Sequence, residues 1–191
     1  MANTKRFNQL EKRIKVIESS YLPKISPTGS YSNKEQDDLR AFLLLIHAEI
    51  ESYFEEVSEN KVKTAFKNWK AKRSRSNVLL SLVSFCGDDI HGKDLEDRIH
   101  KALTLYISKL KKNHGIKGNN ILDILLPVGI EHNSIDLTWL NTMTSFGTNR
   151  GEVAHSTAAV QQPLDPVTLK NTVMLIMTEV KKMDQEIKKI K

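Results

Sequence analysis

The feature that most constrains this chain is a long, regular repeat of apolar residues near its C-terminal end. Their spacings alternate between four and three without a break: Leu169, Val173, Ile176, Val180, Met183, Ile187 and Ile190. This pattern predicts one face of an amphipathic α-helix. Asp165 suits the N-cap of that helix and Pro166 its first turn. The apolar face either packs inside a helical bundle or pairs in part with a second subunit.

The rest of the chain shows the same period, and no stretch of useful length alternates as a strand does. Apolar stripes predict helices over residues 7–17, 33–59, 61–69, 78–86, 94–114 (with Gly115 as its C-terminal cap) and 120–126, and a further helix that Asn133 or Ser134 opens and Gly147 ends. Prolines, glycines and serines predict loops at 21–32 and 87–93. We therefore expect an all-α fold. Residues 1–32 would form a helix and loop packing on a compact helical bundle of residues 33–191, with a long C-terminal helix.

Composition excludes several functional classes. The chain has 191 residues and one cysteine, Cys86, so an internal disulfide or an all-cysteine metal site is impossible within one copy. The apolar neighbours of Cys86 predict a packed core thiol rather than a nucleophile. Glycine-rich phosphate loops, His-Glu-x-x-His, Cys-x-x-Cys and Gly-x-Ser-x-Gly motifs are all missing from the sequence. With no apolar leader and no apolar run long enough to cross a bilayer, we expect a cytoplasmic protein without a membrane partner.

The net charge of +6 permits a polyanion as partner, and its distribution is uneven. Residues 61–86 hold seven bases and no acid, whereas residues 35–59 hold eight acids and one base. A second acid-free run covers residues 98–120. In the first run, cations alternate with aromatic rings, a combination that can pair phosphate contacts with base stacking. The candidate RNA contacts there are Lys67, Trp69, Lys70, Lys72 and Arg73. A solvated helix face with buried aromatics explains the pattern equally well.

The segment from Asn149 to Thr157 is the strongest candidate for chemistry. Asn149 can serve as N-cap of a helix and Glu152 as its capping-box partner, so we expect a helix to start here. Arg150 and His155 can then converge if the arginine folds over the helix, and Gly151 leaves an open patch beside the imidazole. A guanidinium can clamp a phosphate, and an imidazole can move the proton of a ribose hydroxyl.

These residues resemble a known family. Arg150-x4-His155 is similar to the Arg-x(4–6)-His signature of the HEPN superfamily, which consists of compact all-α domains and includes many metal-independent endoribonucleases. The segments Leu39–Glu56 and Ile121–Ile130 resemble the early helix and the stretch before the motif in the RiboL-PSP-type branch. The resemblance covers about residues 35–190. Many catalytic members carry a polar residue directly after the arginine, where this chain has Gly151.

The resemblance implies a function as well as a fold. It implies a homodimer whose two motif helices meet in a composite cleft, where Arg150 holds the scissile phosphate and His155 acts as acid or base. It implies RNA cleavage without metal or other cofactor, leaving a 2′,3′-cyclic phosphate and a 5′-hydroxyl. Members serve as toxins with antitoxin partners, in anti-phage defence and in RNA processing. His47 and Glu51 from the early helix either orient the catalytic pair or simply belong to the helix surface.

The sequence leaves two other hypotheses about the function open. One is a HEPN-like helical module that binds RNA or a nucleotide without cleaving it. The other is a structural dimerisation or adaptor protein that uses the C-terminal apolar face and the acidic helix. Cleavage assays and the oligomeric state distinguish the three.

Overall fold

The computed structural model describes residues 2–86, 94–157 and 161–191, and all regular structure in these ranges is helical. The elements are α1 Lys5–Tyr21, α2 Asn33–Lys72, α3 Asn77–Phe85, α4 Leu95–Lys112, α5 Gly118–Leu125, the 3-10 helix η2 His132–Ser134, α6 Leu137–His155 and α7 Pro166–Lys189. The all-α fold class predicted from the sequence is confirmed. The predicted loop at 87–93 lies outside the described residues.

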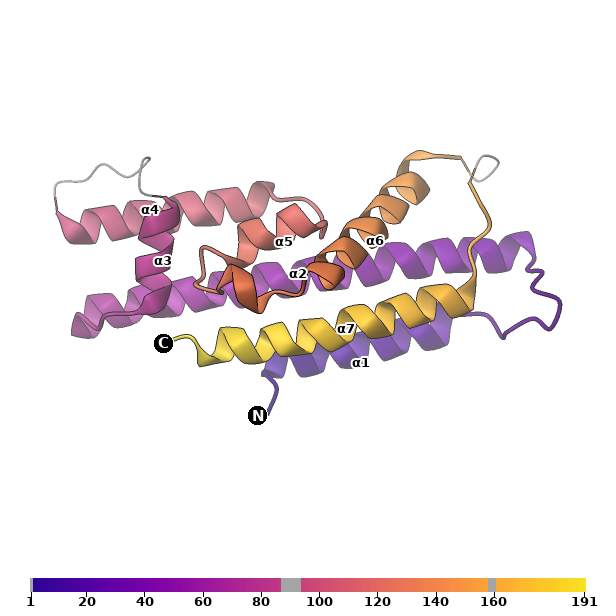
Figure 1. The fold of residues 1–191 in the computed structure, drawn as a ribbon, viewed down its shortest axis with the longest axis horizontal. Coiled ribbons are helices and arrows are strands. Elements are labelled where there is room, and N and C mark those ends of the chain that lie inside the picture. The colour runs from indigo at the N-terminus through magenta and orange to yellow at the C-terminus, as the bar shows by residue number, and fades with distance from the viewer. Residues whose placement is uncertain (1, 87–93, 158–160) are drawn as a thin grey trace.

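One long helix, α2, runs through the molecule; α1, α4 and α7 lie along it, whereas α3 and α6 are inclined to it (Figure 1). Its 40 residues correspond to a rod about 60 Å long. A capping box of Ser32 and Glu35 starts it, and Arg73 in the left-handed conformation (φ 49°) ends it. The prediction of two helices, 33–59 and 61–69, is therefore wrong. The switch from acidic to basic residues does not break the helix, because Lys63 forms an ion pair at 2.8 Å with Glu59, one turn earlier.

The two ends of the chain pack on the N-terminal part of α2. Helix α1 runs antiparallel to α2, as shown by its ion pairs from Arg6 to Glu56 and from Arg13 to Glu49. Helix α7 runs alongside α2 in the same direction, since contacts to α2 progress along both helices: Gln36 with Leu164, Tyr53 with Asp184 and Lys61 with Ile190. The predicted apolar stripes of α1 and α7 are buried, with Ile190 only partly so. The division of the chain at residue 32 stays a prediction.

The middle of the chain packs on the C-terminal part of α2. Helix α4 runs antiparallel to α2, with Glu96 beside Arg73 and His100 against Phe66. Its predicted stripe is buried except for Leu95, which is exposed. Gly115 follows α4 with a φ of 114°, a backbone conformation that suits glycine, but α4 ends at Lys112 rather than directly before Gly115 as predicted. Helix α5 begins at Gly118, two residues earlier than predicted.

Helix α6 leads from the core to the candidate site. Asp136 caps its first turn by accepting a hydrogen bond from Trp139 N at 2.7 Å. The Trp139 ring packs on Phe54 of α2, with centroids 6.1 Å apart. The predicted start at Asn133 or Ser134 is wrong, because these residues form a short 3-10 turn before the helix. In the described part of the chain, no helix is both long enough and apolar enough to cross a membrane.

Candidate functional site

The segment predicted to start a helix is the end of one. Helix α6 runs without interruption through Gly147 and Asn149 to His155, and Ser156 is its C-cap. The prediction of a helix end at Gly147 and a new N-cap at Asn149 is therefore wrong. Gly147 reflects close packing: a Cβ there would lie 3.0 Å from Lys117 Cγ, so the glycine lets α6 approach the turn before α5. Asn149 and Glu152 are both exposed on this last part of α6.

Arg150 and His155 point in different directions. Five residues along an α-helix correspond to a rotation of about 140°, so their side chains leave α6 on different faces. Arg150 is half-buried, and its Nε is buried without a hydrogen-bond partner. His155 is exposed in the last turn. Within the described ranges no contact joins the two side chains, so a single copy presents them as separate groups.

Gly151 leaves open space on α6, as the sequence predicts. A Cβ placed there would meet no atom of another element within 4 Å. An incoming chain can therefore approach the helix backbone closely between Arg150 and His155.

His47 is a buried histidine that lies within electrostatic range of Arg150. It comes from α2, is 2% exposed, and its Nδ1 lies 3.6 Å from the Glu51 carboxylate without a hydrogen-bond partner. Burial lowers the pKa of His47; Glu51 opposes this effect, and the positive charge of Arg150 adds to it. We therefore expect His47 to be neutral at neutral pH, so that it adds no second positive charge to the buried site.

Glu51 ties this group to the turn between α4 and α5. Its carboxylate accepts a hydrogen bond from the backbone N–H of Gly115. A Cβ on Gly115 would lie 3.9 Å from His47 Nε2, so the turn also packs against the imidazole. We call His47, Glu51, Gly115 and Arg150 the α2–α6 cluster. The structure thus brings together three of the predicted site residues, Arg150, His47 and Glu51.

The end of α6 is fixed by residues that the sequence pattern did not single out. Gln161 donates hydrogen bonds to the carbonyl oxygens of Val153 and Ser156, at 3.1 and 2.6 Å, and so covers the exposed end of the helix. Its own carbonyl accepts from Arg40 Nε of α2 at 2.5 Å. This chain of contacts connects the turn that carries His155 to α2. Because 121 residues separate Arg40 from Gln161, no local pattern could have paired them.

The predicted basic segment forms the C-terminal end of α2. The Arg73 guanidinium lies 5.5 Å from the centre of the Trp69 ring and 2.6 Å from the Glu96 carboxylate of α4. Lys70 lies 3.9 Å from the same carboxylate. A base could stack on the Trp69 face that Arg73 covers only if Arg73 moved away.

Lys67 and Lys72, the other two lysines among the predicted RNA contacts, are exposed. Neither makes an ion pair within the part of the chain that the structure describes. RNA contact by the basic segment stays a prediction.

Among the described residues, no group of three or more His, Cys, Asp or Glu side chains lies close enough together to hold a metal ion. Cys86 is buried, as predicted, and its Sγ lies 3.8 Å from the Ala102 carbonyl oxygen.

Comparison with protein families gives one match. The family model described as RiboL-PSP-HEPN matches residues 8–189, which is nearly the whole chain and begins inside α1. Comparisons with curated proteins and with solved structures gave no match.

Proposed function

The chain belongs to the RiboL-PSP-HEPN family, and we propose that it is a metal-independent endoribonuclease. In this proposal, Arg150 holds the scissile phosphate and His155 transfers protons. His47 and Glu51 position Arg150, while Asn149 and Glu152 flank the reacting groups on α6. The substrate is RNA, because the reaction uses the ribose 2′-hydroxyl as its nucleophile.

The observation that carries the proposal is the state of Arg150. Its guanidinium is half-buried next to a histidine that burial keeps neutral, and its Nε has no partner among the described residues. A buried donor without a partner is costly, and an anion that accepts its hydrogen bond removes that cost. Gly151 beside it leaves room for a phosphate to approach. A guanidinium can bind a phosphate through two parallel hydrogen bonds.

The chemical step needs one base and one acid. The base removes the proton from the 2′-hydroxyl, and the 2′-oxygen attacks the adjacent phosphorus. The bond from phosphorus to the 5′-oxygen breaks, and the acid protonates that leaving oxygen. The products are a 2′,3′-cyclic phosphate and a 5′-hydroxyl. Arg150 stabilises the charge that develops on the phosphate oxygens.

Two copies of the chain supply the acid and the base in this proposal. His155 is exposed at the end of α6 and is turned away from Arg150 of its own copy. A homodimer in which the two α6 ends meet would place two imidazoles near one phosphate. One copy of His155 then removes the 2′-proton, and the second copy protonates the leaving oxygen.

A biological role as toxin or anti-phage effector is part of the same proposal. Its support is the family, together with a reaction that would damage cellular RNA. Expression of the wild type should then arrest growth, whereas His155→Ala should not. An antitoxin, if present, would protect the cells.

The test is an RNA cleavage assay in EDTA. The wild type should cleave, and His155→Ala should lose about 10²-fold or more of the rate, because a positioned proton donor or acceptor contributes that much. His132→Ala is the matched control, since His132 is also exposed but lies in η2 outside the site. Absence of cleavage by the wild type, or equal rates for the wild type and His155→Ala, would rule out the enzyme. RNA binding without cleavage would identify a non-catalytic HEPN module instead.

A further inference from the structure

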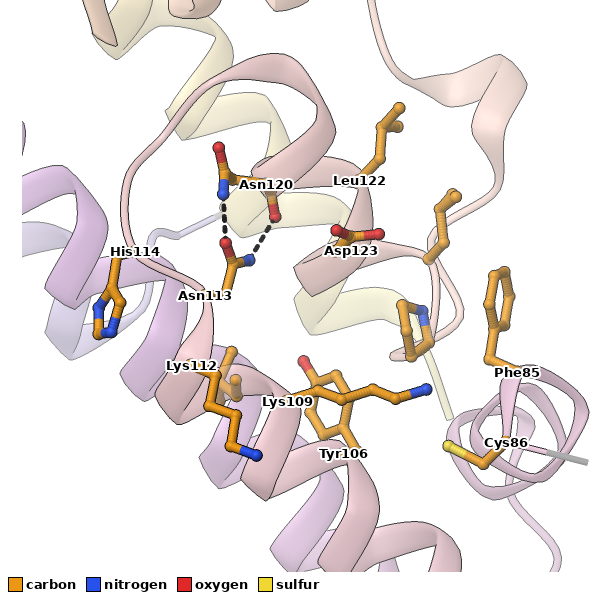
Figure 2. Close-up of a pocket in the computed structure, with 13 residues that line it drawn as sticks. Phe85, Cys86, Tyr106, Lys109, Lys112, Asn113, His114, Asn120, Leu122 and Asp123 are labelled. Carbon is orange, nitrogen blue, oxygen red and sulfur yellow. Dashed lines mark hydrogen bonds between the residues drawn. The ribbon is translucent and has the colours of Figure 1, made fainter. Parts of the chain in front are cut away.

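A cavity of about 660 Å³ lies between α3, α4 and α5, next to the α2–α6 cluster (Figure 2). Its size is within the range of small-molecule and nucleotide sites. Tyr106 and Cys86 are buried in its wall, and the Tyr106 hydroxyl donates to the Ile124 carbonyl oxygen at 2.8 Å, so this wall is fixed. The proposed reaction assigns no role to this cavity.

The two ends of the cavity differ in chemistry. One end carries polar groups of the turn after α4, and the other carries apolar groups of α3 and α5, as Figure 2 shows. The polar end is lined by Lys112, Asn113, His114 and Asn120. Phe85 and Cys86 lie at the opposite side, the Lys109 side chain extends toward them (Figure 2), and Leu122, Leu126 and Pro127 also line the cavity. Phe85 is 52% exposed, which leaves a large aromatic face open to a ligand.

The polar end is held in place by its own hydrogen bonds. Asn113 Nδ2 donates to the Asn120 carbonyl oxygen at 2.8 Å, and Asn120 Nδ2 donates to Asn113 Oδ1 at 2.5 Å. Lys112 is exposed and makes no ion pair in the described ranges. His114 lies within electrostatic range of the Glu55 carboxyl of α2. Lys109 and Lys112 both line the cavity, and Lys112 is the lysine beside Asn113 and His114 at its polar end.

The polar end is also the end nearest to the candidate site. The position of a Cβ on Gly115 would be 3.9 Å from Asn120 Oδ1 and 3.9 Å from His47 Nε2. Asn120 Oδ1 and His47 Nε2 are therefore at most twice 3.9 Å apart. The polar end of the cavity is therefore close to His47 of the α2–α6 cluster.

We propose that this cavity is a nucleotide subsite of the same RNA substrate, with the base against Phe85 and a backbone phosphate at Lys112 and His114. The inference rests on the proposed function for the identity of the strand. Base stacking on an aromatic face and cation contacts to the backbone are the two features shared by single-strand RNA sites. Asp123 is the one carboxylate among the lining residues. The Asp123 carboxylate would repel a phosphate and can accept hydrogen bonds from the amino group of a base. The base, rather than the phosphate, would therefore lie on the Asp123 side of the cavity.

The test measures RNA binding without cleavage. All variants carry His155→Ala, so that the RNA is bound but not cleaved. Phe85→Ala or Lys112→Gln is added to this background, and the affinity for a short single-stranded RNA is measured by fluorescence anisotropy. Each change should weaken binding at least about fivefold, because stacking and phosphate contacts are lost. The slope of log affinity against log salt should fall by about one for Lys112→Gln and stay unchanged for Phe85→Ala.

The matched controls lie on the same helices outside the cavity. Leu80 is exposed and apolar on α3, and Lys111 is exposed and basic on α4. Leu80→Ala and Lys111→Gln should leave the affinity within twofold of the background. If the cavity variants behave like these controls, or if no RNA binds, the subsite is wrong. If the binding pattern holds but the wild type does not cleave, the subsite stands and the ribonuclease proposal fails.

Discussion

At the scale of single residues, two of the described buried polar atoms without a hydrogen-bond partner belong to the candidate site, while Ser58 Oγ, Trp69 Nε1 and Trp139 Nε1 are others on α2 and α6. His47 Nδ1 and Arg150 Nε are both buried without hydrogen-bond partners among the described residues. Unsatisfied buried polar groups are uncommon in folded proteins, and they cluster where a ligand completes the hydrogen bonds. The two atoms belong to α2 and α6, so packing of these helices sets their separation.

The lowered pKa of His47 predicts a pH-dependent stability. Because the folded state disfavours the protonated imidazole, the unfolded chain binds the proton more readily. The free energy of unfolding should therefore fall as the pH drops below the ordinary histidine pKa of about 6.5, with a slope of at most about 1.4 kcal/mol per pH unit from this group. Urea titrations between about pH 7.5 and pH 5 should show a steeper loss for the wild type than for His47→Gln. Equal slopes would contradict a neutral, buried His47.

The roles of the site residues stay predictions, whereas the structure does test where these residues lie. Arg150, His47 and Glu51 were named from motif and helix context, and the structure brings them together. The predicted convergence of Arg150 with His155 within one copy is wrong, because it assumed that a helix starts at Asn149, whereas α6 runs through this residue. Both glycine and asparagine are common at helix ends, but Gly147 is required by close contact with Lys117. Such a contact between distant segments has no local signature.

At the scale of elements, the continuity of α2 organises the molecule. The same helix contributes His47 and Glu51 to the site and Lys67 to Arg73 to the basic segment. The sequence pattern indicated two helices here, since the sign of the charge changes near Asn60. The buried face continues across this point through Ser58 and the apolar residues Val62 and Ala65. Charge patterning alone was therefore a poor guide to the helix boundary.

A proline at position 60 tests the continuity of α2. Asn60 is exposed, so its replacement removes no core packing. Asn60→Pro should lower the free energy of unfolding by about 3 kcal/mol, because proline removes a helical hydrogen bond and clashes with the preceding turn. Asn60→Ala, the control, should change it by less than about 0.7 kcal/mol. Equal stabilities of the two variants in urea would indicate a loop at this position.

At the scale of the whole molecule, a buried carboxylate joins the two ends of the chain to α2. Asp184 of α7 is fully buried and accepts hydrogen bonds from Thr4 N at 2.8 Å, Thr4 Oγ1 at 2.6 Å and Tyr53 OH at 2.7 Å. Burial and the hydrogen bond to Asp184 raise the pKa of Tyr53, so the hydroxyl remains a donor. The apolar stripe of α7 was predicted correctly, whereas Asp184 was not, because its partners are up to 180 residues away.

Loss of this carboxylate should destabilise the whole fold. Asp184→Ala leaves three buried or partly buried donors without an acceptor, and we expect a decrease of about 2–4 kcal/mol in the free energy of unfolding. Glu186→Ala is the control: Glu186 makes only a surface ion pair with Lys189, so the change should stay below about 1 kcal/mol. A similar small effect for both variants would show that Asp184 does not hold the chain ends together.

The central claim is that this HEPN domain cleaves RNA through the 2′-hydroxyl without a metal. Mass spectrometry of an RNA incubated with the wild type in EDTA tests it most directly, because the ends of the fragments record the nucleophile. We predict fragments with a 2′,3′-cyclic phosphate and a 5′-hydroxyl, and no fragments from the same RNA methylated at every 2′-oxygen. Intact RNA, or fragments ending in a 5′-phosphate and a 3′-hydroxyl, would contradict the claim.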